Sequence, residues 1–125
     1  MNNTRHRVVI TGMGCLSPLG QSVGEFWDNL VKGKSGIGPL TLCDPTGFPC
    51  QIAGEVSDFQ PEQYVDPREA RRMARFSQLA VAAAREAIAH ADLDIGSYPN
   101  PDRIGVVMGN GNNGSNLREH HCWDL

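Results

Sequence analysis

Two short apolar runs, each rich in β-branched residues and ended by glycine, most constrain how this chain can fold. Residues 7–12 read RVVITG, and residues 103–109 read RIGVVMG. Continuous runs of this kind are typical of strands that are covered on both faces of a sheet. We therefore expect two buried strands, one near each end of the chain, with helices between them.

Three further segments carry helix or strand signals. Ser22 and Glu25 have the spacing of a capping box, and apolar residues then recur at helical spacing until Gly33. Asp66 and a first-turn proline predict a second helix running to about residue 92, whose half from 76 to 91 is alanine-rich and suits burial. Residues 34–61 are rich in glycine and proline, which predicts loops with one strand-like fragment at 51–56.

This order of elements predicts an α/β fold with a parallel or mixed sheet covered by helices. Two strong strands and one weak strand are too few to cover the apolar faces of both helices. We therefore expect that further strands follow Leu125, and that residues 1–125 form one part of a larger domain.

Composition and charge exclude several function classes. No apolar run is long enough to cross a bilayer, and the first residues lack the apolar stretch and cleavage site of a signal peptide, so we expect no membrane partner and a cytoplasmic location. The net charge of −3 argues against general nucleic-acid binding. The four cysteines have no paired spacing, which favours free thiols over a disulfide or zinc framework.

Two motifs suggest ligands but have simpler explanations. Gly109, Gly111 and Gly114 follow a predicted strand with the spacing of a dinucleotide fingerprint, although the acidic residue expected about 20 positions later falls past the chain end. A plain glycine turn, with no cofactor, is the alternative that we favour. Residues 120–122 read His-His-Cys, but adjacent helical side chains diverge by about 100° and cannot converge on one metal ion.

A group of basic residues is more informative. Arg68, Arg71, Arg72 and Arg75 are three, four and seven positions apart, so one continuous helix would place them on a shared face. Such a face is either solvated charge or a docking surface for an anionic partner, since guanidinium groups bind carboxylates and phosphates bidentately. The pattern alone leaves both interpretations open.

Several segments together resemble the β-ketoacyl-acyl carrier protein synthases, especially the synthase II type. The first is residues 7–20, RVVITGMGCLSPLG. The others follow in the family's order and are Phe26-Trp27, GKSGI at 33–37, AGEV at 53–56, RRMARF at 71–76 and RIGVVMG at 103–109.

The resemblance implies a thiolase-like fold of two related αβαβα halves, of which this chain would be most of the first. It implies an acyltransferase that elongates acyl chains by decarboxylative Claisen condensation with malonyl-acyl carrier protein, in fatty acid or polyketide synthesis, and that works as a homodimer. The family's cysteine nucleophile and two histidines would lie beyond Leu125. We therefore assign no catalytic residue here and expect the 125-residue chain alone to be inactive.

The resemblance also implies two binding roles. Arg68, Arg71 and Arg72 fall where the family places basic residues that meet the acidic carrier protein. Asn112 falls where the family often has an apolar residue lining the acyl pocket near the dimer interface, and a polar amide beside a fatty chain is costly unless it is hydrogen-bonded. The open alternatives are a non-catalytic partner that resembles the chain-length-factor subunits and a nucleotide-binding oxidoreductase built around residues 109–114.

Overall fold

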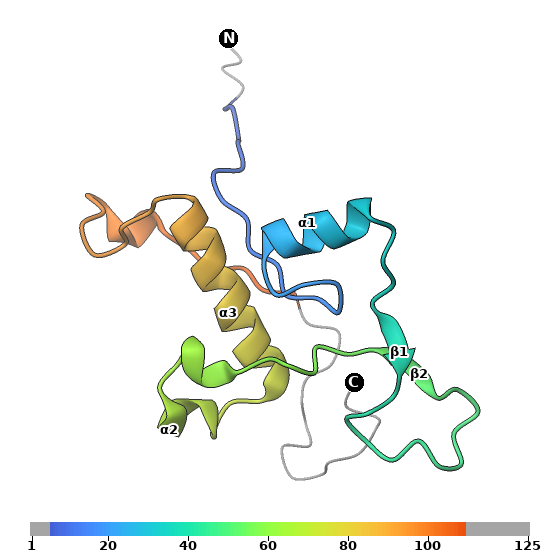
Figure 1. Ribbon diagram of the computed structural model, residues 1–125. Coiled ribbons are helices and arrows are strands. Elements are labelled where there is room, and N and C mark those ends of the chain that lie inside the picture. Colours follow the sequence, from blue (N-terminus) through green and yellow to red (C-terminus); the bar gives the residue numbers. More distant parts are fainter. Residues whose placement is uncertain (1–5, 110–125) are drawn as a thin grey trace.

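A computed structural model describes residues 6–109 of the chain (Figure 1). One long helix lies near the middle of the molecule, the other helices lie on different sides of it, and a short two-stranded sheet lies to one side (Figure 1). The elements in chain order are α1 (Val23–Val31), β1 (Ile37–Pro39), β2 (Ile52–Gly54), the 3-10 turn η1 (Pro61–Gln63), α2 (Pro67–Ala70), α3 (Arg75–His90) and the 3-10 turn η2 (Pro101–Arg103).

Helix α1 begins and ends where the sequence predicts. The hydroxyl of Ser22 accepts a hydrogen bond from the Glu25 amide at 3.2 Å. The Glu25 carboxylate turns back to accept from the Gln21 amide at 2.9 Å, one residue before the partner expected in a capping box. The helix ends at Val31, Lys32 is its C-cap, and Gly33 follows with a φ of +67°. The predicted start and stop signals are therefore confirmed.

The strand-like fragment at 51–56 is confirmed as β2. It pairs with β1 in an antiparallel register that sets Ile37 opposite Gly54 and Pro39 opposite Ile52. Within the described residues the sheet consists of these two strands, so the predicted parallel or mixed sheet is not formed there.

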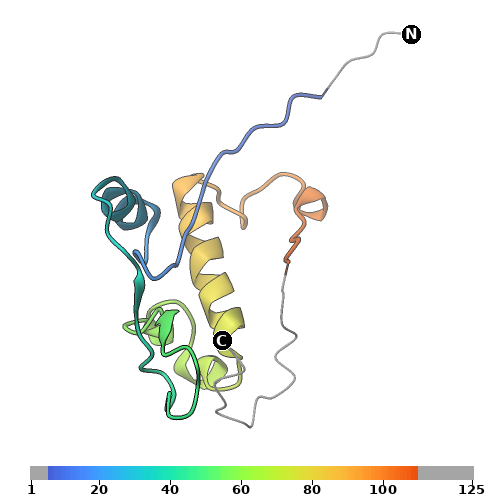
Figure 2. The same cartoon turned by 90° about the vertical axis from the view of Figure 1, so that its right-hand side faces the viewer.

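The prediction of two buried strands is wrong for the described part of the chain. Residues 7–12 and 104–109 form no ladder, and the side chains of Val8 and Val107 are 90% and 99% exposed. The first of these segments leads away from the helices in both views (Figures 1 and 2). A β-branched run favours extended backbone, but a strand also needs a neighbour for its amides and carbonyls, and no described segment offers one.

The single helix predicted from residue 66 to about 92 is also wrong, because it is broken into α2 and α3. Residues 71–74 form a turn, in which Arg72 and Met73 donate to carbonyls three residues back, and Ala74 is extended with ψ of 151°. No glycine or proline lies at the break. Tertiary bonds described below, rather than local propensity, end the first helix there.

Helix α3 packs its alanines directly against a glycine loop. A methyl group built on Gly14 would collide with the Ala83 carbonyl and lie 2.9 Å from the Ala87 nitrogen, and one on Gly12 would lie 2.7 Å from the Ala91 nitrogen. Ala83, Ala87 and Ala91 are four residues apart and so form one ridge of the helix. We call this contact the glycine–alanine seam.

Side chains of α3 extend this contact to α1. The two carboxylate oxygens of Glu86 accept from the amides of Cys15 and Val23, each at 2.8 Å. His90, one turn further, places Nδ1 3.2 Å from the Met13 nitrogen. The loop before α1 is thus held between α1 and α3, as Figures 1 and 2 show.

The interior is small. Phe59, Ala70 and Ala82 are the buried apolar residues of the described chain, and Ala82 is the fully buried residue of α3. The prediction that residues 76–91 form a buried helix is therefore too strong, because most of that helix is half-buried and Ala84 is exposed.

Candidate functional site

The predicted docking arginines lie on α2 and on the turn that follows it. Arg68 is the second residue of α2, Arg71 is its C-cap, and Arg72 comes next. All three side chains are exposed, and none forms an ion pair with another residue of the described range 6–109. Residues 66–75 hold four arginines against two carboxylates, so this segment is positively charged although the whole chain is acidic. We call Arg68, Arg71 and Arg72 the basic face.

Local chemistry fixes the start of α2. The Asp66 carboxylate accepts from the Arg68 amide at 2.8 Å, and Pro67 occupies the first helical position, where its missing N–H costs no bond. On its inner side Ala70 is 2% exposed. The predicted N-cap at Asp66 is thus confirmed, and the basic face starts from a defined helix end.

Arg75 does not share the role that its spacing predicted. Its guanidinium lies 5.6 Å from the centroid of the Phe59 ring and donates a hydrogen bond to the Val56 carbonyl. Phe59 in turn stacks on Tyr64 with centroids 5.6 Å apart. The break after α2 separates Arg75 from the other three arginines, and this cation–π contact ties the start of α3 to the segment before α2.

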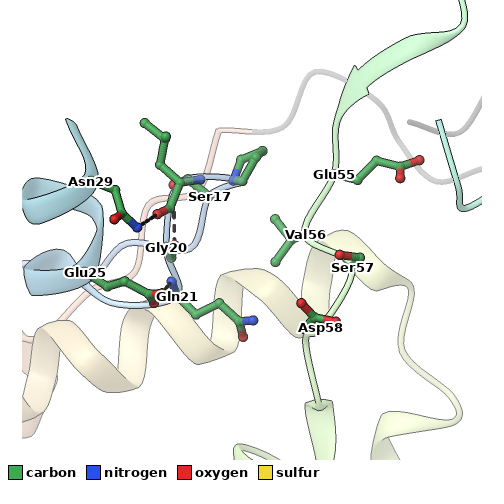
Figure 3. A pocket seen from close by; sticks show the side chains of 11 residues that line it. Ser17, Gly20, Gln21, Glu25, Asn29, Glu55, Val56, Ser57 and Asp58 are labelled. Carbon is green, nitrogen blue, oxygen red and sulfur yellow. Dashed lines mark hydrogen bonds between the residues drawn. The ribbon is translucent and has the colours of Figure 1, made fainter. Parts of the chain in front are cut away.

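A polar cavity of about 210 Å³ lies between the loop before α1 and residues 55–58 (Figure 3). Sequence reasoning did not predict it. One wall is held by the Asn29 amide, which donates to the Leu19 carbonyl at 2.5 Å, and by paired backbone bonds between Ser17 and Gly20. Most polar groups of this wall are therefore hydrogen-bonded within the wall itself. The two walls come from segments that are distant in sequence.

On the opposite wall Glu55 is directed away from the cavity (Figure 3). Its carboxylate accepts from the Thr41 hydroxyl at 2.7 Å and from the amides of Thr41 and Leu42. The Thr41 hydroxyl bond, followed by the Leu42 amide bond, lowers the pKa of Glu55. This carboxylate is a structural acceptor rather than a free acid or base.

The remaining predicted site residues lie outside the described residues. These are Asn112, the glycines at 111 and 114, and the histidines and cysteine of residues 120–122. Within residues 6–109 no three His, Cys, Asp or Glu side chains are placed to hold a metal ion. Among the same residues no helix has the length and apolar character needed to span a membrane.

The cysteines differ from one another. Cys15 is a half-buried free thiol and Cys50 an exposed one, as predicted. Cys43 is disulfide-bonded, so the prediction of free thiols throughout is wrong at this residue. Spacing along the chain therefore did not predict the state of this thiol, because bonding depends on three-dimensional distance.

Comparison with known proteins identifies the family. The model of the β-ketoacyl synthase N-terminal domain matches residues 5–123. The chain belongs to the β-ketoacyl synthase family. It is 50% identical over 105 residues to 3-oxoacyl-[acyl-carrier-protein] synthase 2 of Staphylococcus aureus, covering 84% of this chain and 25% of that protein. It is 42% identical over 118 residues to the Synechocystis protein of the same name, covering 94% of this chain and 28% of the relative.

A solved structure confirms the fold class. The ishigamide ketosynthase/chain length factor superposes with a TM-score of 0.69 at 41% sequence identity, covering 74% of this chain and 23% of that one. The chain thus has part of the thiolase-like ketosynthase fold, and the predicted resemblance is correct. This β-ketoacyl synthase chain spans about a quarter of the length of the curated relatives it matches.

Proposed function

We propose that this chain is the N-terminal part of a 3-oxoacyl-[acyl-carrier-protein] synthase. The enzyme would elongate acyl chains by decarboxylative Claisen condensation with malonyl-acyl carrier protein, in fatty acid or polyketide synthesis. The observation that carries the proposal is the 42–50% identity to synthases of that name across 84–94% of this chain.

The exposed apolar segments support the placement of this chain within a larger domain. Val8 and Val107 stand in extended, unpaired runs, and a row of open amides and carbonyls is a template for strand pairing. Further strands of the synthase and its second protomer would cover such surfaces. By itself the 125-residue chain is inactive in this proposal, because the family's nucleophile and histidines lie elsewhere.

The basic face is the part of this chain that meets the carrier protein in our proposal. Its three guanidinium groups are exposed and unpaired among the described residues, and they lie on a capped helix end. Such charges speed the encounter with an acidic protein and set its orientation. We also propose, from the family resemblance, that Asn112 contributes to the acyl pocket.

A non-catalytic subunit is the second candidate function. It is favoured by the similarity, at 41% identity, to a structure whose title names both a ketosynthase and a chain length factor. The two candidates differ in whether the synthase carries a cysteine nucleophile. Acylation by a small acyl-CoA, followed by mass spectrometry, separates them, because a chain length factor would remain unmodified.

Charge reversal of the basic face tests the carrier role. In the full-length synthase, changing Arg68, Arg71 and Arg72 to Glu should slow association with the acidic carrier protein and weaken its dependence on salt. Self-acylation by a small acyl-CoA bypasses the carrier and should stay near normal. The control variant changes Lys32, Lys34 and Arg85 to Glu. These three residues are also exposed, and their replacement changes the net charge by the same amount.

The comparison of the two triple variants decides the outcome. Slower carrier association in the first variant alone supports docking at the basic face. An equal loss in both variants would assign the effect to net charge. Loss of self-acylation together with carrier binding would make the three arginines structural.

A further inference from the structure

The side-chain amide of Gln78 joins α3 to the end of α2. Its Nε2 donates to the Ala70 carbonyl at 2.7 Å and lies 3.4 Å from the Met73 carbonyl. The last carbonyls of a helix have no partner within that helix. Gln78 therefore acts as a C-terminal cap for α2 that is supplied by another element.

Helix α2 depends on such ties because it is only four residues long. One helical turn is not stable alone, since forming it fixes several residues for very few hydrogen bonds. Its start is held by Asp66 and its inner side by burial of Ala70. Its end has no glycine and no local side-chain cap; the Ala70 carbonyl accepts from the Met73 amide at 3.2 Å, and the side-chain amide of Gln78 adds a second, tertiary bond to the same carbonyl.

The position of Gln78 relates it to the basic face. Ala70 lies between Arg68 and Arg71, and the Met73 carbonyl follows directly after Arg72. Both views place α2 beside the first turns of α3 (Figures 1 and 2). A change in the path of residues 70–73 would redirect Arg71 and Arg72 relative to Arg68, which lies at the capped start of α2.

We propose that Gln78 is a positioning residue for the basic face. It holds α2 and the following turn in the one arrangement that presents Arg68, Arg71 and Arg72 together to an anionic protein partner. The inference rests on the proposed carrier docking. If the basic face is already ordered before binding, its residues lose less conformational entropy when the complex forms. Gln78 is uncharged, so this effect is separable from electrostatic attraction.

Amide hydrogen exchange tests the positioning itself in the full-length synthase. Gln78→Met removes the donor at similar size, and Gln78→Glu replaces it by a carboxylate facing carbonyl oxygens. Both should speed exchange of the amides of residues 70–73 by roughly five- to tenfold, with the larger effect in Gln78→Glu. Gln63→Met is the matched control, since Gln63 is exposed and its side chain has no hydrogen bond within the described residues.

Carrier binding tests the consequence in the full-length synthase. Gln78→Met should weaken binding of the acidic carrier protein by about threefold, as expected when an interface must be ordered on binding. The dependence of binding on salt should stay as in the natural protein, because no charge has changed. The triple arginine variant should instead reduce that salt dependence.

The two measurements keep the inference separate from the proposed function. Faster exchange at residues 70–73 with weaker, equally salt-dependent binding supports the inference. Unchanged exchange in both Gln78 variants, or equal changes in Gln63→Met, would overturn it. Faster exchange with unchanged binding would overturn the link to docking. If the arginine variant leaves carrier binding intact, the proposed docking fails, while the exchange result still decides whether Gln78 positions α2.

Discussion

The two ends of α3 hold their neighbours by different means. Near its C-terminal end the helix backbone touches Gly12 and Gly14, and the fit depends on the absence of side-chain atoms. Near its N-terminal end Arg75 and Gln78 reach outward and bond the carbonyls of other segments. Substitutions at the close-packed glycines should therefore destabilise the fold most, because the added atoms meet backbone. Substitutions that remove a single hydrogen bond should each cost less stability.

The sharpest test of the glycine–alanine seam is Gly14→Ala. The added methyl group meets the backbone of Ala83, which cannot rotate away as a side chain can. We expect a loss of about 3 kcal/mol in the free energy of unfolding, measured by urea titration. Gly24→Ala is the control, because a methyl group there meets no atom within 4 Å, and it should leave stability unchanged or raise it by up to about 1 kcal/mol. Equal stability of the two variants would contradict the seam.

Glu86→Gln tests the polar bond that accompanies the seam. The substitution leaves one carboxylate position as an N–H donor facing a backbone N–H, so either Cys15 or Val23 loses its acceptor. We expect a loss of about 2 kcal/mol and faster exchange of the amide that loses its acceptor. Glu62→Gln, at an exposed carboxylate, should change stability by less than about 0.5 kcal/mol. Unaltered exchange at both amides would show that Glu86 is dispensable.

Arg75→Met tests the opposite end of α3. It removes the cation–π contact with Phe59 and the bond to the Val56 carbonyl while keeping an unbranched side chain. A destabilisation of about 1 kcal/mol is expected, with Arg75→Lys intermediate because it keeps the charge but loses the planar fork. Arg85→Met, at an exposed position of the same helix, serves as the control. If Arg85→Met costs as much, the effect belongs to helix composition.

Local signals predicted some parts of this structure well. Ser22, Glu25 and Gly33 define α1, and Asp66 defines the start of α2, because helix ends are set by short-range hydrogen bonds. The break after α2 was missed because residues 71–74 favour helix locally, and the bonds from Gln78 come from outside that window.

Non-local pairing explains the other errors. The runs at 7–12 and 104–109 have strand composition, yet a ladder requires a partner that composition cannot supply. The spacing predicted that Arg68, Arg71, Arg72 and Arg75 share one face of a continuous helix, but that helix is broken, so Arg68, Arg71 and Arg72 lie on α2 and the turn after it while Arg75 begins α3. The cavity bounded by Ser17 and Asp58 had no signal, since its walls are about 40 residues apart in the chain.

Acid titration of Glu55 should give the smallest effect, and it probes a polar contact that involves no side chain of α3. The Thr41 hydroxyl and the Leu42 amide lower the pKa of Glu55 in the folded chain relative to the unfolded chain. The carboxylate therefore contributes stability above the ordinary glutamate pKa, and this contribution is lost as the pH falls through the lower, folded-state pKa.

Asp44 and Asp94 also have lowered pKa values, through Thr46 and Ser97, so the stability of the natural chain will fall in acid for several reasons. The difference between the natural chain and Glu55→Gln isolates one of them. That difference should be present at neutral pH and shrink to nothing in acid, and the Leu42 amide shift should follow the same titration in an NMR experiment. A constant difference at all pH values would mean that the glutamine acts through packing instead of lost charge.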